Sequence, residues 1–560
     1  MNVKNSLIFV SILSFVTSCS GNQSISSSSQ VVYKSLELSF SHPSGFYDKQ
    51  FNLKVNGDHP SEIYFTTDGS EPTKQSNKYS SDILINNVSN KENEISNITN
   101  ISSLENVYFP DFNVDKCSIY KFKGYDSFGN ESKTYSCIYF VGLTGEFYKN
   151  IPIVCINTKN DNLFDYEKGI YVTGKTYDEG KKEGYPETYP ANYNNKGKDW
   201  ERPATFTFFD KNHEYSFSQE IGMRIHGGWT RAFNQKSFNL YARKEYSGTN
   251  VFEKQLFETN TTKTFMLRSG GYRDTTITKS RDCLVQDFAK TLNLSVQDSY
   301  PAILFLNNEY WGIYNMQERY SDTYIEEHYG INNKNVIIVE NDEIDEGEIS
   351  DATLYTDMLS FFKNNDLSDE TKYQEASNIL DVDDFINYLS CQLIVGNIDW
   401  PGNNVRLWRS REITNKNKED GKWRFLLYDT DDSMDIHTKC SVSSDPFLNT
   451  THWAKGPLDP NCTVGLILTS LLKNESFKTS FKTKFKEILA NVFSPSKVNS
   501  YLQCKYELLL NPLKASYFRF VSMDEKYADG TYFKKEIDKI NSFFVNRPNY
   551  LLNYLNEHIK

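Results

Sequence analysis

The sequence predicts an α+β protein in which a small all-β domain precedes a two-lobed region, the first lobe rich in strands and the second rich in helices. Three observations support this prediction. Short β-branched and aromatic runs separated by turn residues fill residues 31–145, glycine-punctuated strands continue to about residue 320, and apolar residues recur at helical spacing beyond it. A chain of 560 residues also exceeds what one hydrophobic core normally holds, which favours several domains.

The amino-terminal segment has the pattern of an export signal. Lys4 precedes a mostly apolar run, Leu7–Val16, that is too short to span a bilayer as a permanent helix. Residues 16–19 (Val-Thr-Ser-Cys) resemble a bacterial lipobox, in which Cys19 becomes the lipidated first residue; an ordinary signal peptide with an incidental cysteine is the alternative. We therefore expect a lipoprotein signal peptide at residues 1–19, a flexible tether at residues 20–30, and an exported protein anchored in the membrane through Cys19, at the cell surface or the periplasmic face.

Composition narrows the classes of partner and site. The formal net charge of -12 argues against nucleic acid as a partner, because phosphate backbones are bound by clustered Lys and Arg. None of the nine cysteines belongs to a Cys-x-x-Cys pair, so a zinc site is not expected. Proximity in the sequence leaves two candidate disulfides, Cys117 with Cys137 and Cys440 with Cys462.

Residues 31–145 have the pattern of a β-sandwich. The run from Tyr64 to Thr73, with its Asp-Gly turn, resembles the fibronectin-like domain found at the C-terminus of chitobiase and β-hexosaminidase enzymes. The resemblance implies a spacer for a neighbouring domain, and polysaccharide binding is the alternative. The polar stretch 92–105 is expected to be an inserted loop. Six strand-like segments are predicted: Leu36–Phe40, Phe51–Val55, Ile63–Thr67, Asp82–Ile85, Ser118–Tyr125 and Thr134–Val141.

The β-rich lobe, residues 146–320, contains a candidate phosphate site. A predicted strand ends near His226, a turn follows at Gly227 and Gly228, and Lys236 opens the next strand. Glycines let backbone N–H groups approach phosphates and a lysine neutralises their charge, so these two glycines and Lys236 are candidate nucleotide-binding residues. A plain turn with a solvated lysine is the competing interpretation.

Two later elements of this lobe also fit nucleotide binding. A helix predicted over residues 279–292 carries Asp282 and Asp287, either of which is a candidate to hold Lys236, as an acid on a kinase helix does. Two strands follow, and Met316 to Arg319, at the end of the second, are expected to line an adenine pocket, with Met316 and Glu318 as the candidate nucleotide-binding residues. For the helix, the alternative is an ordinary acid that the helix dipole favours. For the strand end, the alternative is an edge strand with a salt-bridged turn.

The helical lobe, residues 321–560, contains the most informative pattern. Asp399 and Asn404 precede a hairpin predicted over residues 405–428, and Asp429 and Asp431 follow it. Protein kinases supply a catalytic Asp, a metal-holding Asn and a metal-holding Asp in this order. Asp399 is therefore the candidate catalytic residue, and Asn404, Asp429 and Asp431 are candidate ligands of Mg²⁺ or Mn²⁺. Helices are predicted over Asp351–Asn364, Thr371–Leu380, Val382–Val395, Thr463–Leu472, Ser476–Val492, Ser496–Leu510 and Phe533–Val545.

Together these segments resemble the CotH (spore coat protein H) kinase family. The resemblance implies an atypical, secretory-pathway-type protein kinase fold that phosphorylates Ser or Thr of surface and coat proteins with ATP and a divalent metal. It also implies that Lys236 contacts phosphate, Asp399 is the catalytic Asp, and Asp429 with Asp431 binds metal. The likeness covers about residues 150–440 and is carried by Gly222–Arg243, Arg281–Glu318, and the Asp399/Asn404 and Asp429/Asp431 pairs.

One position departs from the family pattern, because Trp229 stands where a small hydroxyl residue is expected, and this predicts crowding of the nucleotide. The leading expectation is a surface-anchored kinase that transfers the ATP γ-phosphoryl group to Ser or Thr of an extracytoplasmic or coat protein. The alternative is a catalytically inactive adhesion or scaffold protein that binds protein or polysaccharide partners. A carbohydrate-active hydrolase is a third class, but no pair of carboxylates can be assigned as its acid and nucleophile.

Overall fold

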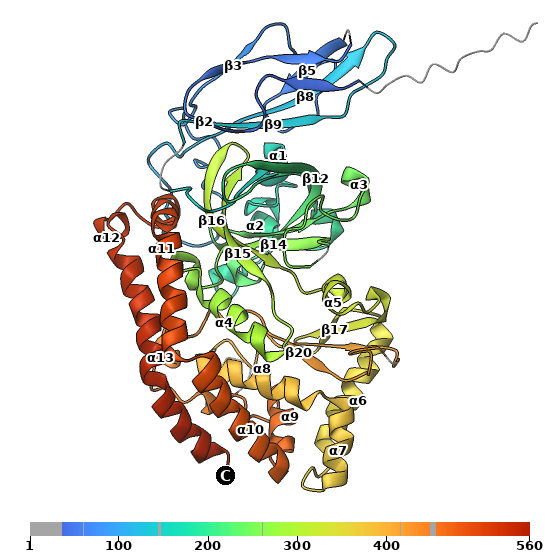
Figure 1. The fold of residues 1–560 in the computed structure, drawn as a ribbon, viewed down its shortest axis with the longest axis vertical. Coiled ribbons are helices and arrows are strands. Elements are labelled where there is room, and N and C mark those ends of the chain that lie inside the picture. The colour runs from blue at the N-terminus through green and yellow to red at the C-terminus, as the bar shows by residue number, and fades with distance from the viewer. Residues whose placement is uncertain (1–35, 60, 144–146, 260, 415, 449–454) are drawn as a thin grey trace, which may run out of the picture.

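The fold is described from a computed structural model for residues 36–59, 61–143, 147–259, 261–414, 416–448 and 455–560 (Figure 1). The predicted signal peptide, Cys19 and the tether lie outside these residues. An all-β region, a barrel of strands and a larger, mainly helical region follow one another along the chain (Figure 1). This arrangement confirms the α+β class.

The amino-terminal region is all-β, as predicted. Five strands form one sheet in the order β2-β9-β8-β5-β6, and two ribbons, β1-β4 and β3-β7, complete it. Leu53, Phe122 and Tyr139 are buried in its core. The strands are β1 (Leu38–Phe40), β2 (Gly45–Tyr47), β3 (Phe51–Leu53), β4 (Val55–Gly57), β5 (Ser61–Thr66), β6 (Asn77–Lys78), β7 (Ile83–Ile85), β8 (Ser118–Asp126) and β9 (Tyr135–Val141).

The stretch expected to be an inserted loop joins this region to the barrel. The backbone N–H groups of Glu94, Ile95 and Ser96 donate to the carboxylate of Glu309, which is fully buried. Ile95 and Ile101 pack into the core of the barrel. Charge-assisted hydrogen bonds in a dry environment are stronger than exposed ones, so this segment holds the all-β region against the barrel.

Seven strands close into a barrel in the order β10-β11-β12-β13-β14-β16-β15. Neighbouring strands are antiparallel, except β10 and β15, which run parallel. Phe206, Phe238 and Leu304 are fully buried in its core. The strands are β10 (Ile153–Asn157), β11 (Arg202–Phe209), β12 (Tyr215–His226), β13 (Ser237–Tyr241), β14 (Thr264–Arg268), β15 (Ser299–Leu306) and β16 (Glu309–Glu318). The helices of this part of the chain are α1 (Asn160–Phe164), α2 (Gly174–Glu179), α3 (Lys244–Ser247) and α4 (Arg281–Ala289), the last within the range predicted for it.

A four-stranded sheet in the order β18-β17-β19-β20 follows the barrel. It consists of β17 (Val336–Glu340), β18 (Glu343–Glu346), β19 (Arg406–Ser410) and β20 (Arg424–Leu426). The last two form the predicted hairpin, with Arg406 opposite Leu426. Because paired antiparallel strands begin and end together, the chain before β19 and the chain after β20 emerge at the same end of the hairpin. This register brings Asn404 and Asp429 to one edge of the sheet.

The rest of the chain is mainly helical. Apolar stripes from several helices meet in the largest core, which includes Leu389, Leu468 and Phe544. The helices are α5 (Asp322–Tyr329), α6 (Ala352–Asn364), α7 (Glu370–Ile379), α8 (Val382–Val395), α9 (Thr463–Leu471), α10 (Glu475–Glu487), α11 (Pro495–Phe520), α12 (Glu525–Ala528) and α13 (Thr531–His558).

Two helices are longer than predicted, because each continues through a proline at which the predicted helix had already ended. α11 continues past Pro512, and α13 continues past Pro548. A proline inside a helix costs about 3 kcal/mol. Burial of Leu513 and Tyr517 beyond the first proline offsets this cost, so packing overrides the local preference.

The final turn of α11 reaches back to the barrel beside β16 (Figure 1). The guanidinium of Arg519 lies 4.4 Å from the centroid of the Trp311 ring. A Cβ atom on Gly312 would lie 2.9 Å from the ring of Phe520, so this close approach requires glycine. The predicted boundary at residue 320 therefore separates strands from helices along the sequence, but in space α11, from the helical part, packs against the barrel.

The structure addresses the two candidate disulfides and the presence of membrane-spanning helices. The eight cysteines that the structure describes are free thiols, so neither Cys117 and Cys137 nor Cys440 and Cys462 are bonded to each other. Within the described ranges, no helix combines the length and the apolar character needed to cross a membrane.

Candidate active site

A cleft of about 840 Å³ opens between the barrel and the helical region. Its walls come from the turn after β12, the end of β14 and the segments 398–406 and 428–439. Seven lining residues are Lys or Arg and six are Asp or Glu, whereas the whole chain has a formal charge of -12. The cleft is therefore less negative than the chain as a whole, which favours an anionic ligand here over the rest of the surface.

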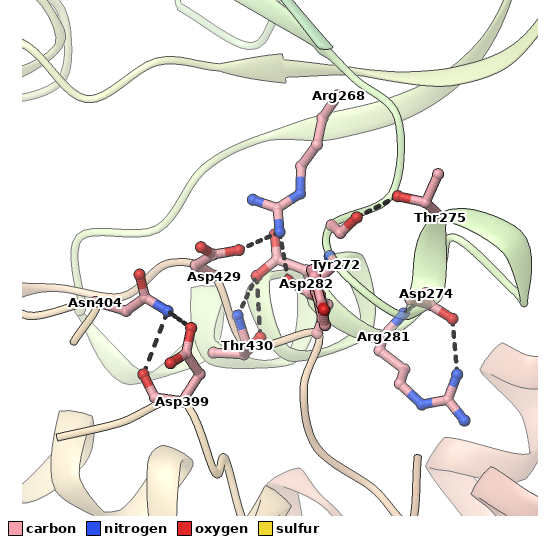
Figure 2. Close-up of polar contacts among 12 residues, drawn as sticks. Arg268, Tyr272, Asp274, Thr275, Arg281, Asp282, Asp399, Asn404, Asp429 and Thr430 are labelled. Carbon is pink, nitrogen blue, oxygen red and sulfur yellow. Dashed lines mark hydrogen bonds and ion pairs between the residues drawn. The ribbon is translucent and has the colours of Figure 1, made fainter. Parts of the chain in front are cut away.

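Asp399 enters the cleft from the loop after α8. The helix ends at Gly396, whose φ of 67° is a left-handed conformation that favours glycine. The carboxylate of Asp399 accepts a hydrogen bond from Nδ2 of Asn404 at 2.9 Å (Figure 2). It accepts a second from Nδ2 of Asn403 at 3.1 Å. Burial, followed by the charge of Asp429, raises the pKa of Asp399 to about 6. A carboxylate with such a pKa can accept a proton near neutral pH.

Asn404 and Asp429 are both held in the left-handed backbone region. Their φ angles are 57° and 56°, and non-glycine residues adopt such angles at a cost, most often at functional sites. The side-chain amide nitrogen of Asn404 donates a hydrogen bond to Asp399, so the amide oxygen of Asn404 is directed away from that carboxylate (Figure 2). The side chain of Asp429 is 35% exposed and opens into the cleft.

Arg268, the last residue of β14, joins the two acidic residues that follow β20. Its Nη2 donates to a carboxylate oxygen of Asp429 and, at 2.6 Å, to Oδ1 of Asp431. Burial opposes ionisation of Asp429, but the charge of Arg268 outweighs it and lowers the pKa of that carboxyl. Burial and the neighbouring charge of Asp429 raise the pKa of Asp431 well above its ordinary value. One guanidinium therefore balances two adjacent carboxylates.

Gly271 fixes the position of Asp431. Its φ is 98°, and a Cβ atom there would lie 2.1 Å from Oδ2 of Asp431. The same oxygen accepts a hydrogen bond from the backbone N–H of Tyr272 at 2.9 Å. The chain after β14 therefore passes so close to Asp431 that no side chain fits between them.

Helix α4 holds the segment between the two acids. Asp282 accepts hydrogen bonds from the backbone N–H of Thr430 at 2.9 Å and from its hydroxyl at 3.0 Å (Figure 2). Asp287, on the same helix, accepts a hydrogen bond from the hydroxyl of Tyr501 at 2.9 Å. Neither acid meets Lys236, so the prediction that one of them holds this lysine is wrong.

Residues 223–551, more than half of the chain, match the family described as CotH kinase protein. The chain belongs to the CotH kinase family. Residues 42–92 match the chitobiase/β-hexosaminidase C-terminal domain, which confirms the resemblance seen between Tyr64 and Thr73. No curated protein sequence matched the chain. Membership of the CotH kinase family indicates a kinase-like function and, in general, the use of ATP and a divalent metal.

Lys236 does not face the cleft of this CotH kinase domain. Its Nζ donates to the backbone carbonyls of Ile101 at 2.6 Å, Arg231 at 2.6 Å and Phe233 at 2.7 Å. These three bonds use every proton of the ammonium group, which is fully buried and whose pKa burial lowers well below its ordinary value. The prediction that Lys236 contacts phosphate is therefore wrong. It ties the turn after β12 to the amino-terminal region.

The expected adenine-binding residues also point elsewhere. Met316 is fully buried in the barrel core, and the carboxylate of Glu318 contacts Nε2 of His328 at 2.8 Å. The cleft is lined by the next two residues, Arg319 and Tyr320. The connection after β16 therefore reaches the cleft through Arg319, the last residue of the predicted range, and through Tyr320 beyond it.

The glycine turn lies where it was predicted. Gly227, with a φ of 108°, and Gly228 both line the cleft. Trp229 follows them, and its ring packs against Tyr185 and Tyr272 with centroid distances of 5.4 and 6.2 Å. The ring is 38% exposed and stands at the wall of a cleft of about 840 Å³, so crowding of a nucleotide by Trp229 stays a prediction.

Sequence reasoning missed Arg268. The signal was present, because an arginine ends an otherwise apolar strand, Thr264–Arg268, directly before Ser-Gly-Gly. A charged residue at the end of a buried strand needs a partner. The partners are Asp429 and Asp431, and the sequence separation of about 160 residues hides them.

The residues that would hold a divalent metal have the right chemistry. Among the described residues, no group of three His, Cys, Asp or Glu is placed to bind a metal ion. The candidate set is two carboxylates, Asp429 and Asp431, with the amide oxygen of Asn404, and hard oxygen donors suit Mg²⁺ or Mn²⁺. Asp429 is open to the cleft, and both carboxylates already bond one cation, Arg268, so the donor set fits a metal ion that shares or replaces this arginine contact.

Proposed function

We propose that this protein is an ATP-dependent protein kinase that phosphorylates Ser or Thr of an extracytoplasmic protein. The observation that carries the proposal is the convergence of Asp399, Asn404 and Asp429 on one cleft, beside Arg268. These residues come from the loop after α8, the end of a hairpin and the end of a barrel strand. The cleft is also lined by seven Lys or Arg against six Asp or Glu, in a chain with a formal charge of -12, which favours a triphosphate here over the rest of the surface.

The order of parts along the chain supports the proposal. A glycine turn lies between β12 and β13, a cation ends the next strand, β14, and an acid follows on α4. Protein kinases place a glycine-rich turn, a lysine on the third strand and an acid on the next helix in this order. Here Arg268 takes the place of the lysine, and Asp282 holds Thr430 next to Asp429.

The chemistry assigned to the chain is proton acceptance and positioning. Asp399 accepts the proton of the Ser or Thr hydroxyl as its oxygen attacks the γ-phosphorus, and the bond to the bridging oxygen breaks to release ADP. Asn403 and Asn404 orient the Asp399 carboxylate for this step. Asp429, Asp431 and Asn404 would hold a divalent metal, which supplies neutralisation of phosphate charge when bound.

The test is phosphoryl transfer by the chain from residue 20 onwards. The protein is incubated with γ-labelled ATP, Mg²⁺ or Mn²⁺ and a mixture of acidic and basic acceptor proteins. We expect label on Ser or Thr, and a loss of about 10²-fold or more in Asp399→Asn. Asp357→Asn makes the same Asp-to-Asn substitution at an exposed position of α6 and serves as the matched control.

The same experiment separates the kinase from a scaffold protein without chemistry. Absence of transfer in the wild-type protein, together with no rise in melting temperature on adding metal and ATP, would leave only the adhesion or scaffold function. Nucleotide-dependent stabilisation without transfer would identify a binding protein that has lost catalysis.

We also propose that the protein is exported and anchored by lipid at Cys19, with the chitobiase-type domain as a spacer between membrane and kinase domain. The supporting observations are the short apolar segment before Cys19 and the attachment of residues 94–96 to Glu309. Metabolic labelling with a fatty acid should mark the wild-type protein and not Cys19→Ser. Equal labelling of both proteins would exclude this anchor.

A further inference from the structure

Three cations that line the cleft come from separate segments of the chain. We call Lys196, Arg273 and Lys439 the cationic rim. Asn195, next to Lys196, accepts a hydrogen bond from Arg231 of the glycine turn at 3.3 Å. Arg273 pairs with Asp432 at 3.2 Å. Lys196 is thus placed beside the glycine turn, and Arg273 beside the segment 432–439 that carries Lys439.

Two of these cations have no counter-charge. Lys196 and Lys439 are exposed, and within the described part of the chain neither forms an ion pair. Arg406, another cation of the cleft, is by contrast paired: it contacts Asp345 at 3.1 Å and also bonds Glu340. In a chain with a formal charge of -12, unpaired lysines that line a cleft are complementary to an anionic ligand.

Aromatic rings lie beside the rim. Tyr185, Trp229 and Tyr272 form a row, which we call the aromatic shelf, with centroid distances of 5.4 and 6.2 Å between neighbours. Tyr185 is 56% exposed and Trp229 is 38% exposed. Rigid, exposed aromatic side chains offer contact area to a partner at little entropic cost. The rim and the shelf together make a surface for an extended segment, whose carboxylates would contact the lysines and whose backbone would pack on the aromatic rings.

This surface borders the catalytic residue. The backbone N–H of Ile398, which precedes Asp399, donates to the carbonyl of Asp432 at 3.0 Å. Asp432 is in turn the partner of Arg273, and the N–H of Tyr272 bonds Asp431. A segment that presents a hydroxyl group to Asp399 along this surface therefore contacts the rim and the shelf.

We propose that the acceptor of this kinase is an acidic, extended protein segment, held by Lys196 and Lys439 and packed on the aromatic shelf. This inference rests on the proposed phosphoryl transfer at Asp399, and it names the substrate class of that site. Carboxylates on either side of the acceptor hydroxyl meet the two unpaired lysines. Because both lysines are exposed, dissolved salt screens their attraction beyond about one Debye length, near 8 Å at physiological salt, which makes binding sensitive to salt.

The test measures binding of peptides to the wild-type chain without nucleotide. Three fluorescent peptides share one central serine and carry Asp and Glu, Gln, or Lys around it. We expect the acidic peptide to bind about tenfold more tightly than the Gln peptide at low salt. The double variant Lys196→Glu/Lys439→Glu should lose this preference and favour the Lys peptide. Lys486→Glu/Lys535→Glu makes the same change of net charge at exposed positions on α10 and α13 and should behave as wild type.

The outcomes distinguish this inference from the proposed function. Acidic-peptide binding that depends on Lys196 and Lys439, without phosphoryl transfer when ATP is added, would support the docking surface and overturn the kinase. Transfer to all three peptides at equal efficiency would support the kinase and overturn the acidic acceptor. A single-stranded oligonucleotide that binds the rim as tightly as the acidic peptide would also overturn it, because the rim would then attract any polyanion.

Discussion

The Nη2 atom of Arg268 lies 2.6 Å from Oδ1 of Asp431, although the two residues are 163 positions apart in the chain. The same atom also bonds Asp429. The contact joins the end of a barrel strand to the segment after the β19–β20 hairpin, across the cleft. Four predictions test what this contact and its neighbours do.

Replacing Arg268 with alanine should make the protein depend on divalent metal for stability. Removing one partner of a buried ion pair costs about 3–5 kcal/mol, because the remaining charges are uncompensated. Asp429 and Asp431 would then repel each other, and Mg²⁺ or Mn²⁺ should restore most of the loss. Melting temperatures in EDTA and in metal, without nucleotide, measure the effect.

Arg224→Ala is the matched control for this change. Arg224 pairs at 2.7 Å with Glu201, a buried carboxylate of the barrel region that also bonds Arg243 and Lys198. The Arg224→Ala variant should have a lower melting temperature than wild type, and Mg²⁺ or Mn²⁺ should not restore it. An equal response of both variants to metal would rule out a metal-binding role for Asp429 and Asp431.

Gly271→Ala should disrupt the Asp431 site more than its backbone strain alone explains. The new Cβ would lie 2.1 Å from Oδ2 of Asp431 at a φ of 98°. Gly129→Ala has a similar φ of 88° with open space around it, so it carries only the strain, about 1–2 kcal/mol. We expect stabilisation by metal and ATP to survive in Gly129→Ala and to be lost in Gly271→Ala. Thermal shift with and without metal-ATP compares the two, and equal shifts would contradict the assigned role of Asp431.

Lys236→Met should destabilise the fold without a specific effect on nucleotide binding. The change leaves three buried carbonyls without a donor, at a cost of more than about 3 kcal/mol. Lys486→Met, an exposed change on α10, should stay within about 0.5 kcal/mol of wild type. Denaturant unfolding measures both. A folded Lys236→Met protein with weakened affinity for ATP would show that this lysine acts at the cleft after all.

Asp399→Asn should be more stable relative to wild type at neutral pH than at acid pH. The folded-state pKa of about 6 exceeds the ordinary value of 3.8, so the folded protein resists ionisation of this carboxyl. Wild-type stability is therefore free of this cost below about pH 4, falls as the pH rises to about 6, and stays reduced above it. The difference between variant and wild type should grow by about 1–3 kcal/mol between pH 4 and pH 7.

This measurement is made in EDTA, so that metal binding does not change the charge near Asp399. Asp357→Asn, at an exposed position of α6, should show no such trend. A pH-independent difference for Asp399→Asn would mean that the carboxyl has an ordinary pKa and is not poised as a base. Catalytic activity should rise with pH through the same range, because transfer needs the ionised form.

The parts of the site that the sequence predicted are those joined by local structure. Helix α8 spans the predicted residues Val382–Val395 and ends at a glycine, so Asp399 and Asn404 follow within one loop. The register of β19 with β20 returns the chain to the same edge, where Asp429 lies. Helical periodicity, a left-handed glycine and a two-strand hairpin are short-range features, and residue type alone indicates them.

The parts that could not be predicted depend on contacts between distant segments. Lys236 had a suitable residue type and followed a glycine turn, but the carbonyl of Ile101, 135 positions away, holds it in the interior. The helix α11 passes Pro512 because its continuation is buried. In both cases burial and hydrogen bonds from elsewhere in the chain outweigh the local preference.

The sequence by itself determined the CotH resemblance, the amino-terminal chitobiase-type domain, and the order of Asp399, Asn404 and Asp429 along the chain, because each depends on nearby residues and their spacing. Closure of the barrel against the helical region decided which cation meets those acids. A charged side chain lowers the free energy only where its partner lies within a few ångströms. Folding brings that partner to Arg268, at the end of β14, and turns Lys236 away from the cleft.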